Sequence, residues 1–258
     1  MDAGSGGGLR PVDQRRIIAK VNECMSRKDY PGVERTLRYW LAEARAGGDR
    51  RGELMIQNEL VGHYRKTGEK DKALESAGEA LRLLDELGYA GSLSEGTACV
   101  NVATAYSAFG ENEAALRLFR RARAAYESGK NVDPALLGGL YNNMGLALAA
   151  LERYGEAMDL FEKALVQMEK APGGALEMAV TMLNMADAVE KRDGPERGES
   201  EIFPLLDRAE ALLKEGDFPR DGYCAYVYER CAPAFAYYGY FLAAEWLKKQ
   251  AEAIYEGA

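Results

Sequence analysis

The stretch NNMGLALAALERYGEAMDLFEKAL, residues 142–165, decides the fold. Its apolar residues recur every three or four positions, first before residue 151 and again after residue 154. That spacing is typical of an amphipathic helix. The residues between the two segments, 151–154, have the length and polarity of a tight turn between helices. The stretch therefore predicts a helical hairpin.

The same pattern recurs along the chain at a constant offset of 42 residues, from Ala73 to Ala115 and from Ala115 to Ala157. Weaker copies flank these three units on both sides. Downstream, the pattern predicts an extra loop near Gly194 and Pro195 before it resumes. Because a fixed period marks a repeat architecture, the sequence predicts about six helical hairpins and an all-α fold.

At one position of the repeat, the residue is small in the middle repeats. A pair of helices can approach to about 8–9 Å only where such a position is small. The large or polar residues near the two ends are typical of terminal repeats. The column contains Trp40, Ala80, Ala122, Ala164, Ala209 and Ala251.

Helix boundaries are indicated independently of the repeat. Asp133 followed by Pro134 predicts a helix start, with a capping residue before a proline in the first turn. Ser92 and Glu95 have the spacing of a capping box. Glycine and proline at residues 172–174 and 217–219 predict breaks between hairpins.

At this level of detail the chain resembles the tetratricopeptide repeat family, whose second helices carry an alanine–aromatic–alanine pattern. The common repeat of that family has about 34 residues, so this longer unit looks like that of kinesin light chains and bacterial peptide-pheromone sensors. The resemblance implies a single right-handed α-solenoid over residues 11–258, preceded by a flexible glycine-rich tail at residues 1–10. The residues that carry the resemblance are Ala103, Tyr106, Ala115, Phe119 and Ala122, and Gly145, Leu148, Ala157, Phe161 and Ala164.

Composition narrows the classes of function. Hydrophobic residues make up 47% of 258 residues, enough for a sizeable core, and the net charge is −8. An acidic chain repels phosphate backbones, so nucleic acid is not expected as a partner. No apolar stretch reaches the length of a membrane span. The four cysteines have no metal-ligand spacing and three lie in apolar columns, which favours reduced thiols in the cytoplasm.

The sequence predicts no catalytic, metal or cofactor site. His63 is the chain's single histidine, and no GxSxG motif accompanies it. A lone histidine cannot make a histidine-rich metal site, so we interpret His63 as structural. The glycines near the N-terminus are not followed by the lysine and hydroxyl residue of a phosphate-binding loop. We therefore expect a binding protein rather than an enzyme.

Asparagine recurs once per repeat in the predicted first helices, at Asn101, Asn143 and Asn184. Its amide has both a donor and an acceptor, which suits pairing with the backbone of an extended peptide. In the resembling proteins such a ladder contacts peptide backbone. An alternative is structural, because asparagine at this place also bonds the neighbouring helix in ordinary repeats of the family. The other residues predicted to line the groove are Asn142, Thr104, Arg65 and Asp187.

The predicted function is therefore binding of a protein or an extended peptide in a concave groove. Two alternatives stay open at this point. One is a structural protein that assembles with copies of itself through its end hairpins. The other is the ligand-sensing part of a regulator that acts through a partner.

Overall fold

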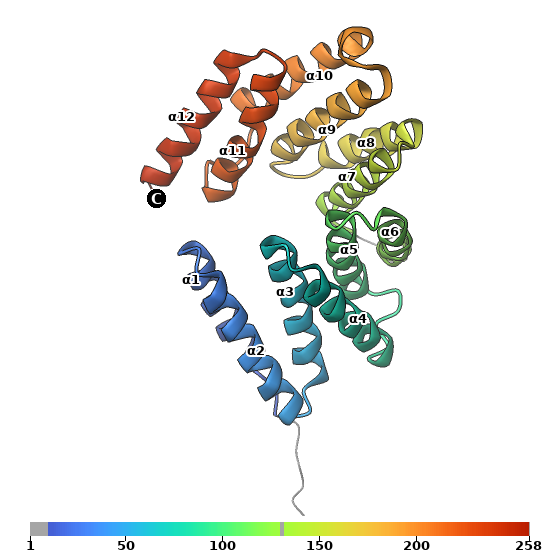
Figure 1. The fold of residues 1–258 in the computed structure, drawn as a ribbon, viewed down its shortest axis with the longest axis vertical. Coiled ribbons are helices and arrows are strands. Elements are labelled where there is room, and N and C mark those ends of the chain that lie inside the picture. Colours follow the sequence, from blue (N-terminus) through green and yellow to red (C-terminus); the bar gives the residue numbers. More distant parts are fainter. Residues whose placement is uncertain (1–9, 130–131, 258) are drawn as a thin grey trace, which may run out of the picture. The chain divides into compact units, whose positions relative to one another are not determined.

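The structure is a computed structural model that describes residues 10–129 and 132–257 (Figure 1). Within these residues it contains twelve α-helices and no strand, which confirms the predicted all-α fold. The first compact unit, 1–130, and the second, 131–258, are described separately below. The first six helices are α1 (Gln14–Ser26), α2 (Tyr30–Ala46), α3 (Arg50–Thr67), α4 (Lys70–Glu86), α5 (Leu93–Ala108) and α6 (Asn112–Glu127). The other six are α7 (Pro134–Ala150), α8 (Tyr154–Met168), α9 (Ala175–Asp193), α10 (Pro195–Glu215), α11 (Gly222–Tyr237) and α12 (Phe241–Gly257).

Each unit consists of three hairpins, and Figure 1 shows the consecutive helices lying side by side in pairs. The first helices of neighbouring hairpins also touch within a unit. Helix α3 contacts α5 in the first unit, and α9 contacts both α7 and α11 in the second. The six predicted hairpins are thus confirmed for the described residues. The single right-handed solenoid over residues 11–258 stays a prediction.

The cores of the hairpins follow the repeat. The alanines of the small column are all buried, while Trp40 is half-buried at one end. Phe119 and Phe161 lie fully buried one turn before Ala122 and Ala164. Gly145 leaves room for the ring of Phe161, because a methyl group on Gly145 would lie 2.5 Å from Phe161 Cε1. In the α7–α8 hairpin, a small residue therefore faces an aromatic one and the two fill the interior together.

The predicted helix starts are confirmed. Ser92 Oγ accepts a hydrogen bond from the backbone N–H of Glu95 at 3.1 Å, and Glu95 Oε2 accepts one from the N–H of Gly91 at 2.7 Å. Asp133 caps α7 by accepting from the N–H of Ala135 at 2.9 Å, and Pro134 occupies the first turn. These side chains satisfy backbone donors that have no partner inside a helix.

The predicted extra loop near Gly194 is wrong. Only Gly194 separates α9 from α10, and its positive φ of 82° makes the turn without a longer connection. The extra residues instead lengthen α10 to 21 residues, with Pro204 inside the helix. Pro195 starts the helix because a proline in the first turn loses no intrahelical hydrogen bond.

Three further expectations concern termini, membranes and cysteines. The predicted glycine-rich tail lies outside the described residues except for Arg10, whose N–H donates to Gly47 O at 3.0 Å. Among the described residues, no helix has both the length and the apolar character that crossing a membrane requires. All four cysteines are buried free thiols, and burial raises the pKa of the Cys231 thiol to about 12. Thiols of this kind are chemically inert.

Candidate functional site

In the second unit, the first helices of the hairpins border a cavity of about 540 Å³. Helices α7, α9 and α11 contribute side chains to it, and the turn between α8 and α9 closes one side. We call this cavity the second-unit groove. The lining residues used below are Gly139, Asn142, Asn143, Glu177, Asp221 and Tyr223.

Asn143 is the predicted ladder residue that lines the groove. Its side chain is half-buried, and among the described residues of the second unit none forms a hydrogen bond with it. The amide therefore has a donor and an acceptor available to a ligand. Its neighbour Asn142 also lines the groove but is already engaged: Asn142 Oδ1 accepts from Asn184 Nδ2 at 2.9 Å and from Thr181 Oγ1 at 3.2 Å.

The other two members of the predicted ladder donate to the preceding hairpin. Asn101 Nδ2, on α5 of the first unit, donates to the backbone oxygen of Asn58 at 2.8 Å and to Asn58 Oδ1 at 3.0 Å. Asn184 Nδ2 makes the equivalent bond to Asn142. These bonds join neighbouring first helices, and they leave the amide oxygens of Asn101 and Asn184 as acceptors.

The groove is acidic and has an aromatic wall. Glu177 and Asp221 line it, and none of its described lining residues is lysine or arginine. The hydroxyl of Tyr223 donates to Glu177 Oε1, and burial together with this carboxylate raises the pKa of Tyr223. Tyr223 also stacks on Tyr226, with ring centroids 6.4 Å apart. The arrangement favours a neutral or basic ligand with a surface for aromatic contact.

Two of the remaining predicted residues belong to the first unit, and one belongs to the second unit but does not line this groove. Thr104 Oγ1 donates to its own helix at Val100 O over 2.7 Å, and Arg65 is exposed; both belong to the first unit. Asp187 is half-buried on α9 and pairs with Lys191 Nζ at 2.7 Å, but it does not line the groove. Of the predicted site residues, only Asn142 and Asn143 lie in the groove itself.

Sequence reasoning missed Glu177 as a groove residue. It precedes Asn184 by seven residues on α9, which is two helical turns, so both lie on one face of the helix. Extending the asparagine column along that face would have found it. Tyr223 is one of six tyrosines within residues 223–240, and the others are Tyr226, Tyr228, Tyr237, Tyr238 and Tyr240. The structure exposes three of the six, Tyr223, Tyr226 and Tyr237.

Comparison with known proteins agrees with the hairpin architecture. A tetratricopeptide repeat model matches residues 96–128 and 138–166. No curated protein matches the chain. BtubC (BKLC) from P. vanneervenii is a similar solved structure, with a TM-score of 0.67 and 21% identity over 80% of this chain and 82% of that chain.

Two other solved structures are similar at lower scores. A putative kinesin light chain of Podosopora anserina with nearly identical TPR-like repeats has a TM-score of 0.53 and 19% identity, over 78% of this chain and 94% of that one. A Rap protein complexed with Competence and Sporulation Factor has a TM-score of 0.52 and 12% identity, over 92% of this chain and 73% of that one. The fold is therefore that of tetratricopeptide-type helical hairpins, and the two hairpin segments matched by the repeat model are similar in sequence to tetratricopeptide repeats.

Proposed function

We propose that the protein is an interaction scaffold that binds an extended peptide segment of a partner in the second-unit groove. The observation that carries this proposal is the half-buried amide of Asn143, which lines a cavity of about 540 Å³ without a hydrogen-bond partner among the described residues of the second unit. A polar group at such a place gains from pairing with a ligand backbone. The Rap protein of similar fold, which was solved in complex with Competence and Sporulation Factor, supports a binding role.

The binding mode follows from the spacing of the first helices. Neighbouring helices pack about 8–10 Å apart, and an extended peptide advances about 3.3 Å per residue. The ligand therefore advances by about three residues from one of the helices α7, α9 and α11 to the next. Asn143 pairs with the ligand backbone, while Glu177 and Asp221 select neutral or basic side chains. A ladder that extends to Asn101 and Asn184 through their amide oxygens remains a prediction.

Site-specific photo-crosslinking in extract of the native cells tests this proposal. Benzoylphenylalanine replaces Tyr223, which lines the groove, or Tyr255, which is exposed on α12 of the same unit and does not line it. We expect the residue at 223 to capture a protein through one contiguous segment, identified by mass spectrometry, and the residue at 255 not to capture it. Equal capture at both positions, or none at position 223, would overturn the proposal.

We also propose that the protein functions in the cytoplasm. All four thiols are buried and unpaired, a condition that is stable in a reducing environment such as the cytoplasm.

Self-association is a second candidate function, favoured by the last hairpin. Phe241 and Leu242, at the start of α12, are 70% and 84% exposed, and Tyr237 lies just before them. Terminal repeats usually present polar outer faces, so adjacent exposed apolar side chains suit contact with another copy.

Sedimentation velocity over a wide range of protein concentration tests this second candidate. We expect the sedimentation coefficient of the wild type to rise with concentration, and Leu242→Asp to shift the equilibrium towards monomer because the carboxylate resists burial. Coefficients that coincide for the two proteins at every concentration would rule out this contact.

A further inference from the structure

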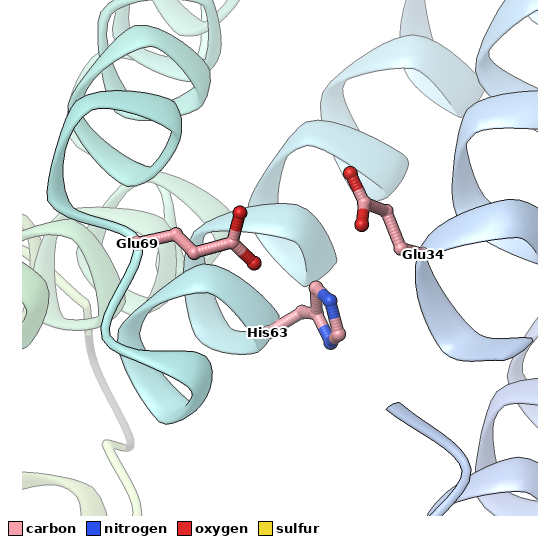
Figure 2. Close-up of side chains that lie close together, drawn as sticks. All are labelled: Glu34, His63 and Glu69. Atoms are coloured by element: carbon pink, nitrogen blue, oxygen red, sulfur yellow. The ribbon is translucent and has the colours of Figure 1, made fainter. Parts of the chain in front are cut away.

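Three side chains of the first unit converge from different elements. Glu34 comes from α2, His63 from α3, and Glu69 from the residue that precedes α4. One ligand atom of each lies within 4.8 Å of those of the other two. Figure 2 shows the two carboxylates on either side of the imidazole and directed towards each other.

His63 is the member of this cluster that requires an explanation. Its side chain is 6% exposed, and His63 Nδ1 is buried without a hydrogen-bond partner. An unsatisfied buried polar atom costs about 1–3 kcal/mol. Burial also lowers the pKa of the imidazole. Among the described residues, none satisfies this buried nitrogen.

Both carboxylates pair with Lys72, and Glu34 Oε1 also lies 3.3 Å from Arg38 Nη1. Lys72 Nζ lies 3.1 Å from Glu34 Oε1 and 2.5 Å from Glu69 Oε2. The lysine holds the pKa of both carboxyl groups below their usual range, so both are ionised. Because the Lys72 side chain is 42% exposed, its flexible stem can move the ammonium into solvent without breaking the core.

Neighbouring hydroxyl groups hold the carboxylates in place. Tyr64 Oη donates to Glu34 Oε1 at 3.0 Å, and Thr67 Oγ1 donates to Glu69 Oε1 at 3.0 Å. Outer partners of this kind are typical of metal-binding carboxylates, because they fix the orientation of the ligand oxygens.

We propose that Glu34, His63 and Glu69 form a binding site for a divalent transition-metal ion of the zinc type, which takes the place of the Lys72 ammonium. One imidazole nitrogen and two carboxylate oxygens are a donor set that suits Zn²⁺, with a fourth position for water. The site ties α2 to α3 and to the turn before α4, and so fixes the first hairpin on the second. This inference concerns the first unit and does not depend on the groove.

Titration of the full-length, tag-free protein with Zn²⁺ tests the proposal. Isothermal titration calorimetry measures the binding, and the NMR signals of the single imidazole report whether His63 takes part. We expect saturable binding of one ion with a shift of the His63 signals. Glu69→Gln, at an exposed turn, is expected to weaken binding by roughly 10–100-fold, and His63→Gln to abolish it. Lys72→Met is expected to bind more tightly than the wild type, because the competing ammonium is gone.

Circular dichroism of each variant shows that it is folded before its affinity is compared. Binding that is lost with His63→Gln and strengthened with Lys72→Met establishes the site. The proposal is overturned if neither the wild type nor Lys72→Met binds Zn²⁺, or if binding persists unchanged in His63→Gln, which would assign the ion to the thiols or to surface carboxylates.

Discussion

Phe161→Ala is expected to lower the free energy of unfolding by about 3–5 kcal/mol. The phenyl ring is fully buried in α8 and packs on Gly145 of α7. Its removal loses the transfer free energy of the ring and leaves a cavity that helices fixed by neighbouring hairpins cannot fill. Urea denaturation followed by circular dichroism measures the change.

Val166→Ala is the matched control for this prediction, because it truncates another apolar side chain of α8. Val166 is 51% exposed, so its loss is expected to change the free energy of unfolding by about 0.5 kcal/mol or less. Equal effects of the two substitutions would contradict the packing described for this hairpin.

Two glycines of α7 are expected to respond in opposite directions when replaced by alanine. At Gly145 the new methyl group would lie 2.5 Å from Phe161 Cε1, and such overpacking costs about 1–3 kcal/mol. At Gly139 nothing lies within 4 Å of the new methyl group, so Gly139→Ala gains helix propensity of up to about 1 kcal/mol. Relative to the wild type, the melting temperature should therefore fall for Gly145→Ala and rise for Gly139→Ala.

The double variant Gly145→Ala with Phe161→Leu identifies the clash as the cause. The smaller leucine leaves room for the methyl group, so Gly145→Ala should cost less in that background than in the wild type. A loss that is the same in both backgrounds would place the strain elsewhere.

The hairpins were predictable because their determinants are local and repeat. Ala157, Phe161 and Ala164 lie on one face of a single helix, and the same triplet recurs at a fixed offset, so periodicity alone indicates both the helix and its buried side. The loop predicted near Gly194 failed for a local reason. A single glycine with positive φ makes the turn, and the repeat shows that residues are added without showing whether they form a loop or lengthen the following helix.

The role of each asparagine was not predictable from its type. Asn101 and Asn184 donate to the preceding hairpin of their own unit, whereas Asn143 belongs to the first hairpin of the second unit and has no earlier hairpin within that unit. An asparagine amide can bind a ligand or join two helices, and the residue opposite it decides which. Asn58 lies opposite Asn101, and Asn142 lies opposite Asn184. Such pairs lie more than forty residues apart in the chain, so no local pattern contains them.

The cluster around His63 could not be predicted for a similar reason. A lone histidine indicates no metal site, because the sequence does not tell which carboxylates surround it. Glu34 belongs to the preceding hairpin and meets His63 only once α2 packs against α3. Burial of the ring, and hence its unpartnered nitrogen, is also a property of that packing.

The central claim is that the amide of Asn143 binds a ligand, whereas Asn142 and Asn184 bond to each other and stabilise the fold. The direct test measures ligand affinity and melting temperature for Asn143→Ala and Asn184→Ala, with a peptide comprising the segment captured at position 223. Asn143→Ala should weaken binding about tenfold, which corresponds to about 1.4 kcal/mol, and leave the melting temperature unchanged. Asn184→Ala loses a 2.9 Å bond to Asn142, so it should lower stability by about 0.5–1.5 kcal/mol. Unchanged affinity of Asn143→Ala for that peptide would contradict the account.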